Sequence, residues 1–116
     1  MIIHLYTGAD GESHFGEIMP DFQKADRGFE RAPLQGVKGL FFNRAPAGHF
    51  LDWHPAPRRQ YVITLSGHAE IQIGDGTVRR FGPGGVFLAE DLTGRGHTLR
   101  IVGDQPYLFV TVPLGE

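Results

Sequence analysis

The chain contains no cysteine, so histidine, carboxylate and amide side chains are the groups left to bind a metal or move a proton. The same absence excludes disulfides, thiolate nucleophiles and zinc-finger sites. One pair has the spacing for acid–base chemistry. Asp52 precedes His54 by two residues, and residues two apart in a strand share a face. An imidazole has an ordinary pKa of about 6.5, so His54, oriented by a carboxylate such as Asp52 or Asp91, is a candidate general acid or base.

A second pattern is a set of spacings around His54. Five residues separate Gly48 from His54, one separates His54 from Ala56, three separate Ala56 from Gln60, and six separate Gln60 from Gly67. A related set follows later in the chain, and its members are Gly85, Asp91, Gly94 and His97.

These two sets resemble the two sequence motifs of the cupin family. The first family motif has two histidines one residue apart, followed by a glutamate. His54 matches the first histidine, whereas Ala56 replaces the second and Gln60 replaces the glutamate. In the second motif, Asp91 replaces a proline and His97 matches the histidine.

The resemblance covers about residues 36–113. It implies an all-β fold, the cupin jelly-roll-like antiparallel β-barrel, with an N-terminal strand and arm. We therefore expect one domain over residues 1–116, with the strand and arm in residues 1–35 and the barrel core in residues 36–114. Small cupins often use such an arm at a dimer interface, so the resemblance also implies a homodimer.

The resemblance further implies that His54, Gln60 and His97 converge in the barrel lumen. They would be the three protein ligands of one divalent transition metal (Zn, Fe, Ni, Mn or Cu), with water completing the shell. Without a metal, the catalytic candidates are His54, His97, Asp91 and Asp52. The expected function is a small-molecule enzyme of isomerase, lyase or oxygenase type, either metal-assisted or acid–base. A barrel that binds a small molecule without catalysis is the alternative.

Several of these residues also have simpler interpretations. His54 and His97 could simply bind backbone carbonyls. Asp52 could pair with Arg58 or Arg59, and Asp91 could be a solvated loop residue. Arg58 and Arg59 form either a solvated turn or an anion-binding fork at the pocket mouth. Trp53 alternates with its neighbours and should face away from the pocket, into packing between the sheets.

The elements that must position these groups are short strands. The 17 glycines and 8 prolines make up 25 of the 116 residues, which favours tight turns over long helices. Short segments rich in β-branched and aromatic residues recur at the regular spacing that is typical of an all-β sandwich or barrel. The expected strands are Ile2–Tyr6, Val37–Phe42, Phe50–His54, Gln60–Leu65, His68–Ile73, Thr77–Phe81, Val86–Ala89, His97–Val102 and Tyr107–Val112.

The segment Thr7–Pro33 is polar and is interrupted by glycine and proline. We expect an extended arm, with one helical turn within Glu12–Ile18. Phe15, Phe22 and Phe29 should pack this arm against the barrel.

The charge and apolar content limit the partners. A formal net charge of -2 lacks the basic excess that binding a phosphate backbone needs. No apolar run approaches the ~20 residues of a membrane span, and the N-terminus lacks the pattern of a signal peptide. We therefore expect a cytoplasmic protein whose partner is a small molecule, and neither nucleic acid nor a membrane.

Overall fold

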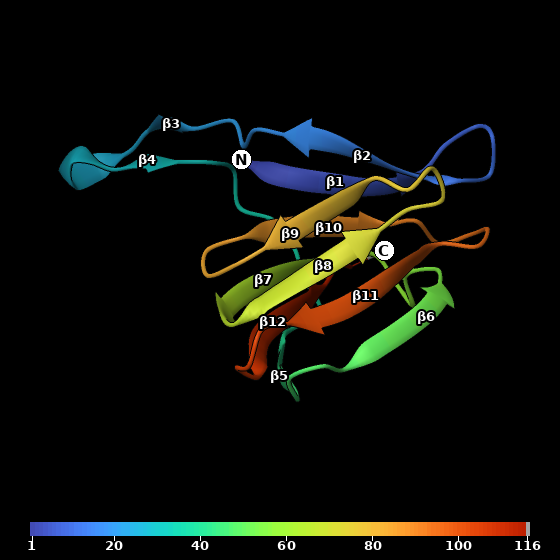
Figure 1. Ribbon diagram of the computed structural model, residues 1–116. Coiled ribbons are helices and arrows are strands. Elements are labelled where there is room, and N and C mark those ends of the chain that lie inside the picture. Colours follow the sequence, from blue (N-terminus) through green and yellow to red (C-terminus); the bar gives the residue numbers. More distant parts are fainter. Residues whose placement is uncertain (116) are drawn as a thin grey trace.

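Two β-sheets face each other in the computed structural model, which describes residues 1–115 (Figure 1). The larger sheet has six strands in the order β2-β1-β10-β7-β12-β5, and the smaller has four in the order β6-β11-β8-β9. The strands of the larger sheet are β1 (Ile2–Thr7), β2 (Ser13–Ile18), β5 (Phe41–Ala45), β7 (Gln60–Ser66), β10 (Val86–Glu90) and β12 (Tyr107–Pro113). Those of the smaller sheet are β6 (Phe50–His54), β8 (His68–Gln72), β9 (Val78–Phe81) and β11 (His97–Val102).

The core between the sheets follows from the alternation of apolar residues. In β8, Ala69 and Ile71 are fully buried while His68 and Gln72 face solvent, as a strand with one buried face requires. Ile71 packs in one cluster with residues of the larger sheet, among them Leu5. The expected all-β class is therefore confirmed.

The N-terminal region differs from expectation. The expected helical turn within Glu12–Ile18 is wrong, because this segment is β2 and pairs antiparallel with β1. β1 in turn pairs parallel with β10, so both strands extend the larger sheet. Ladder hydrogen bonds to β1 satisfy the β2 backbone and override its local turn signals.

The rest of the arm is a small hairpin that projects away from the two sheets (Figure 1). It consists of β3 (Gln23–Lys24), the 3-10 turn η1 (Asp26–Gly28) and β4 (Glu30–Arg31). Phe15 packs on the core, but Phe22 and Phe29 are 52% and 62% exposed. The expected packing of these two rings against the sheets is wrong, because the hairpin carries them outward.

The other expected strands are found with small shifts. β5 begins at Phe41 instead of Val37, because Val37 makes only an isolated bridge to Leu114. Within residues 1–115, η1 is the single helical segment, and its three residues are too few to cross a membrane.

Candidate functional site

A cavity of about 290 Å³ lies between the two sheets. Its wall combines the side chains of three expected site residues, His54, Gln60 and His97, with a mostly apolar lining. They come from β6, β7 and β11, so residues distant along the chain meet in one place. Ala56 also lines the cavity, and its methyl group offers no donor or acceptor at the family's second histidine position.

His54 and His97 are partners in the β6–β11 ladder. Their ring centroids are 4.6 Å apart, and the ring planes are inclined at 56°. Gly96 makes this approach possible: a Cβ built on it would lie 1.9 Å from the His54 carbonyl oxygen, and its φ is +77°. Only glycine has no Cβ to clash with this carbonyl and also adopts a positive φ without strain. Gly96 therefore sets how closely the strands that carry the two imidazoles approach.

His97 is held by a buried carboxylate. Its Nδ1 lies 2.6 Å from Asp91 Oδ2, and the same oxygen accepts a hydrogen bond from Ser13 Oγ at 2.7 Å. Asp91 is 0% and His97 6% exposed. Because the carboxylate accepts, His97 Nδ1 carries the hydrogen and Nε2 keeps its lone pair. The structure therefore fixes one tautomer of an imidazole on the cavity wall.

His54 is oriented by a backbone carbonyl. Its Nδ1 donates to the Asp52 carbonyl oxygen at 2.7 Å, which again leaves Nε2 with a lone pair. The expected pairing of the Asp52 carboxylate with His54 is wrong, because that carboxylate accepts from the Trp53 amide at 2.9 Å. The idea that Asp91 orients His54 also needs correction, since Asp91 binds His97.

The structure also decides between the interpretations of Asp52 and Trp53. Among residues 1–115, the Asp52 carboxylate makes no ion pair with either Arg58 or Arg59. Trp53 does not line the cavity, as expected, but it does not pack between the sheets. It is 36% exposed, and the Arg95 guanidinium lies 4.4 Å from its ring centroid.

Gln60 is buried, and its Oε1 accepts a hydrogen bond from Arg58 Nη1 at 3.3 Å. This bond occupies one lone pair of the amide oxygen and leaves the amide N–H groups as donors.

The donor set fits the expected divalent metal only in part. The two Nε2 lone pairs of His54 and His97 suit a transition metal, and tying Nδ1 to an acceptor is usual for ligating histidines. The third ligand fits less well, because a cation at Gln60 Oε1 would lie beside the Arg58 guanidinium. Residues 1–115 contain no group of three or more His, Cys, Asp or Glu side chains that could hold a metal.

A buried hydroxyl pair lies at another part of the cavity wall. Tyr107 lines the cavity, and its hydroxyl lies 2.6 Å from Thr64 Oγ1. Burial raises the pKa of Tyr107, while the hydrogen bond with Thr64 acts in the opposite direction. The phenol therefore stays neutral at neutral pH.

Ser13 is the site residue that the sequence analysis missed. It lies in β2, and the parallel pairing of β1 with β10 brings it to Asp91, 78 residues away. A lone serine in a polar arm gives no local signal for such a contact.

No family model matches the sequence, and no curated protein matches it. The structure does resemble solved cupins. A Cupin 2 conserved barrel domain protein from Salinispora arenicola aligns with a TM-score of 0.54 and 18% identity, covering 84% of this chain and 91% of that one. A cupin domain from Bordetella pertussis aligns with a TM-score of 0.53 and 17% identity, covering 87% and 100%.

A DMSP lyase from Ruegeria pomeroyi aligns with a TM-score of 0.53 and 22% identity. The match covers 66% of this chain but only 38% of the lyase, so it extends over well under half of that protein. At such identities the comparisons show the fold alone, and the chain has a cupin-like fold with the double-stranded β-helix architecture.

Proposed function

We propose that the protein is a small-molecule enzyme whose cavity performs proton-transfer chemistry of the isomerase or lyase type. The observation that carries this proposal is the buried Asp91–His97 pair, whose imidazole lines an apolar cavity beside a second imidazole. A buried carboxylate that fixes the tautomer of a histidine is the arrangement that supports general acid–base catalysis.

His97 is the proposed base. Its Nε2 takes a proton from an acidic C–H or O–H of the substrate, and Asp91 stabilises the imidazolium that forms. His54 is the complementary group: protonated at Nε2, it would return a proton to another atom of the substrate or to a leaving group. The two imidazoles have a centroid distance of 4.6 Å, so they are close enough to act on one bound substrate as base and acid.

Gln60 has a binding role in this scheme. Because its Oε1 is engaged by Arg58, its amide N–H groups are left to donate to a carbonyl oxygen of the substrate. The apolar remainder of the cavity excludes water from the reacting atoms, which strengthens these polar interactions.

A metal-assisted form of the reaction is the second candidate, favoured by the two Nε2 lone pairs, which accept no hydrogen bond from a donor among residues 1–115. His54 and His97 would hold the ion, with Gln60 as a weak third ligand. The metal would supply Lewis-acid polarisation of a substrate oxygen. Asp91 and the Asp52 carbonyl would orient the two ligating rings.

The test uses phenylacetone as a probe, because it has an apolar ring, a carbonyl oxygen and acidic C–H bonds. Deuterium incorporation in D₂O, followed by proton NMR, measures proton transfer directly. We expect His97→Gln to lower the rate at least 100-fold. Asp91→Asn should lower kcat with little change in KM, because Asp91 positions His97 without touching the probe. His49→Gln, which alters an exposed histidine, is the matched control.

Two other outcomes of this experiment would contradict the proposal. Exchange that is equally fast in wild type and His97→Gln would overturn acid–base catalysis by this residue. Saturable binding of the probe without any exchange would overturn the enzymatic proposal and support a non-catalytic binding protein.

A further inference from the structure

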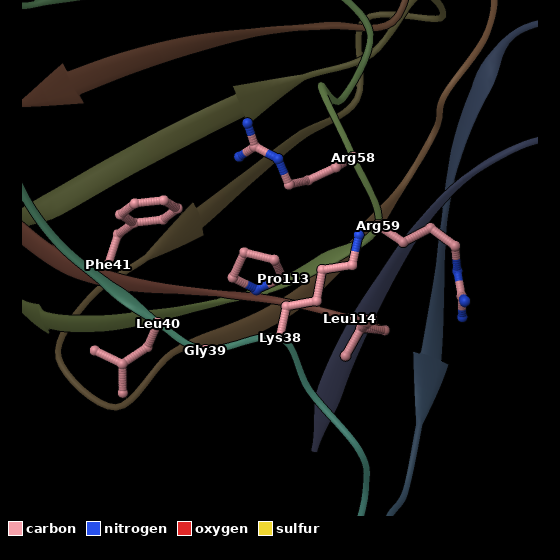
Figure 2. A pocket seen from close by; sticks show the side chains of 8 residues that line it. All are labelled: Lys38, Gly39, Leu40, Phe41, Arg58, Arg59, Pro113 and Leu114. Atoms are coloured by element: carbon pink, nitrogen blue, oxygen red, sulfur yellow. The ribbon is translucent and has the colours of Figure 1, made fainter. Parts of the chain in front are cut away.

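A second hollow of about 430 Å³ lies next to the cavity, at the end of β12. Figure 2 shows its wall, which combines three cationic residues with apolar side chains. We call it the cationic pocket. It is lined by Lys38, Gly39, Leu40, Phe41, Arg58, Arg59, Pro113 and Leu114.

The cationic pocket carries an excess of positive charge. Glu90 binds Arg59 and also accepts from His4 at 2.6 Å. Among residues 1–115, no carboxylate lies within ion-pair distance of Lys38 or Arg58. The whole chain has a net charge of -2. Two cations in one hollow with no carboxylate partner among the described residues therefore give this part of the surface a local positive potential, which attracts anions.

The three cations do not point the same way. In Figure 2 the Arg59 side chain extends toward the blue strands β1 and β2, the Lys38 ammonium ends beside the start of the Arg59 side chain, and the Arg58 side chain extends away on the other side. Because Glu90 binds Arg59, Lys38 and Arg58 are the two cations of the pocket left without a carboxylate partner among residues 1–115.

Backbone hydrogen bonds hold this wall in place. The Lys38 amide donates to the Pro113 carbonyl at 2.9 Å, and the Leu114 amide donates to the Arg59 carbonyl at 3.0 Å. The segments that carry Lys38 and Arg59 are thus both hydrogen-bonded to the end of β12, so the backbone of the fold fixes the shape of the pocket.

Arg58 connects the cationic pocket to the cavity. Its Nη1 donates to Gln60 Oε1 at 3.3 Å, and Gln60 lines the cavity. β12 gives a second connection: Thr111 lines the cavity, and Pro113, two residues later, lines the cationic pocket. Since residues two apart share a strand face, one continuous surface runs from the apolar cavity to the cations.

We infer that the ligand is an amphipathic small organic anion, with its apolar body in the cavity and its carboxylate or phosphate monoester at Lys38 and Arg58. The inference rests on the proposed function only in that the cavity is the ligand site. One Arg58 N–H donates to Gln60, so the other four guanidinium N–H groups can bind the oxyanion, and the Lys38 ammonium adds three donors.

The experiment compares four probes by titration calorimetry and by backbone amide shifts. Phenylacetate and phenyl phosphate carry the two kinds of oxyanion, 2-phenylethanol is the neutral analogue, and inorganic phosphate lacks an apolar body. We expect at least one aromatic anion to bind about tenfold more tightly than the alcohol and than inorganic phosphate. It should shift the amides of both Gly39 and Val62, which report the cationic pocket and the cavity.

The double variant Lys38→Gln/Arg58→Gln should remove this tenfold preference. Lys24→Gln/Arg31→Gln loses the same charge from the projecting hairpin, so it is the matched control and should retain the preference. The aromatic anion that binds more tightly identifies the oxyanion as carboxylate or phosphate.

Equal affinity for the alcohol and both anions would overturn the inference, as would an equal loss in both double variants. Anion binding that shifts Gly39 but never Val62 would also overturn it, because the anion would then be bound without its apolar body in the cavity. His97→Gln separates this test from the proposed chemistry, since it should abolish proton exchange while preserving the preference for the anion.

Discussion

Gly96 lies directly against the backbone carbonyl of His54. A Cβ at residue 96 would be 1.9 Å from that oxygen, closer than any real contact, and the obstacle is backbone that cannot rotate away. Since His54 faces His97 across the same ladder, the separation of the two imidazoles depends on the missing side chain.

The first prediction concerns Gly96→Ala. It should destabilise the protein by about 3 kcal/mol or more, because it combines left-handed backbone strain with a steric clash. Urea unfolding measures the loss. Gly103→Ala is the control: φ at Gly103 is +82°, and a Cβ there meets nothing within 4 Å. The control should cost only about 1–2 kcal/mol, and equal costs would contradict the steric explanation.

The second prediction concerns the support of Asp91 by Ser13. Ser13→Ala removes one of the two hydrogen bonds to a fully buried carboxylate oxygen. We expect a loss of about 1–3 kcal/mol in unfolding free energy, together with a changed ¹⁵N shift of His97 Nδ1. Ser66→Ala, at an exposed serine, should stay within about 0.5 kcal/mol of wild type. Indistinguishable variants would show that Ser13 does not support the site.

The third prediction is a pH dependence of stability from Glu90. Burial raises the pKa of Glu90, but hydrogen bonds and positive charge from Arg59 and His4 outweigh burial and hold the pKa below its ordinary value. The stabilisation is therefore present above the pKa of an unfolded glutamate, about 4.3, and is lost as the pH falls through the lower folded pKa.

Denaturant unfolding from pH 7 down to pH 3 checks this prediction. Glu90→Gln should be less stable than wild type at neutral pH, and the difference should shrink as the solution becomes acidic. Glu30→Gln, in the exposed hairpin strand β4, should show no such convergence. A difference for Glu90→Gln that is constant over the whole range would count against it.

The fourth prediction tests whether the cavity can be completed as a metal site. Ala56 lines the cavity with His54 and His97, so Ala56→His should supply a third imidazole. We expect Zn²⁺ or Ni²⁺ affinity, measured by calorimetry, to rise at least tenfold. The gain should vanish in Ala56→His/His54→Ala. An unchanged affinity in the single variant would mean that the three positions do not converge on one point.

Local sequence information was sufficient for the strands and turns that frame the site. β6 and β11 have the expected bounds, because alternating residues and turn glycines act over short distances. Gly48, Gly67 and Gly94 of the family-like spacings all have φ near +80°, which explains why glycine recurs there.

The features that the sequence did not predict depend on strand pairing and tertiary packing. The helical turn was expected because nothing local shows that β2 pairs with β1. The sequence predicted that Asp52 or Asp91 orients His54, and only the packed structure shows that Asp91 binds His97 while the Asp52 carboxylate accepts from the Trp53 amide. Residue types identified the chemistry, whereas tertiary packing decided which groups interact.

The parallel pairing of β1 with β10 joins Ile3 to Phe87, which lies 84 positions later in the chain. Such contacts close large loops and slow the folding of a polypeptide. Ser13 consequently reaches Asp91 only when the first and last thirds of the chain have come together, so any partly folded state that lacks this pairing leaves the Asp91–His97 pair without that hydrogen bond. A molecule that occupies the cavity can bind only the folded state, so it should stabilise the entire domain against unfolding.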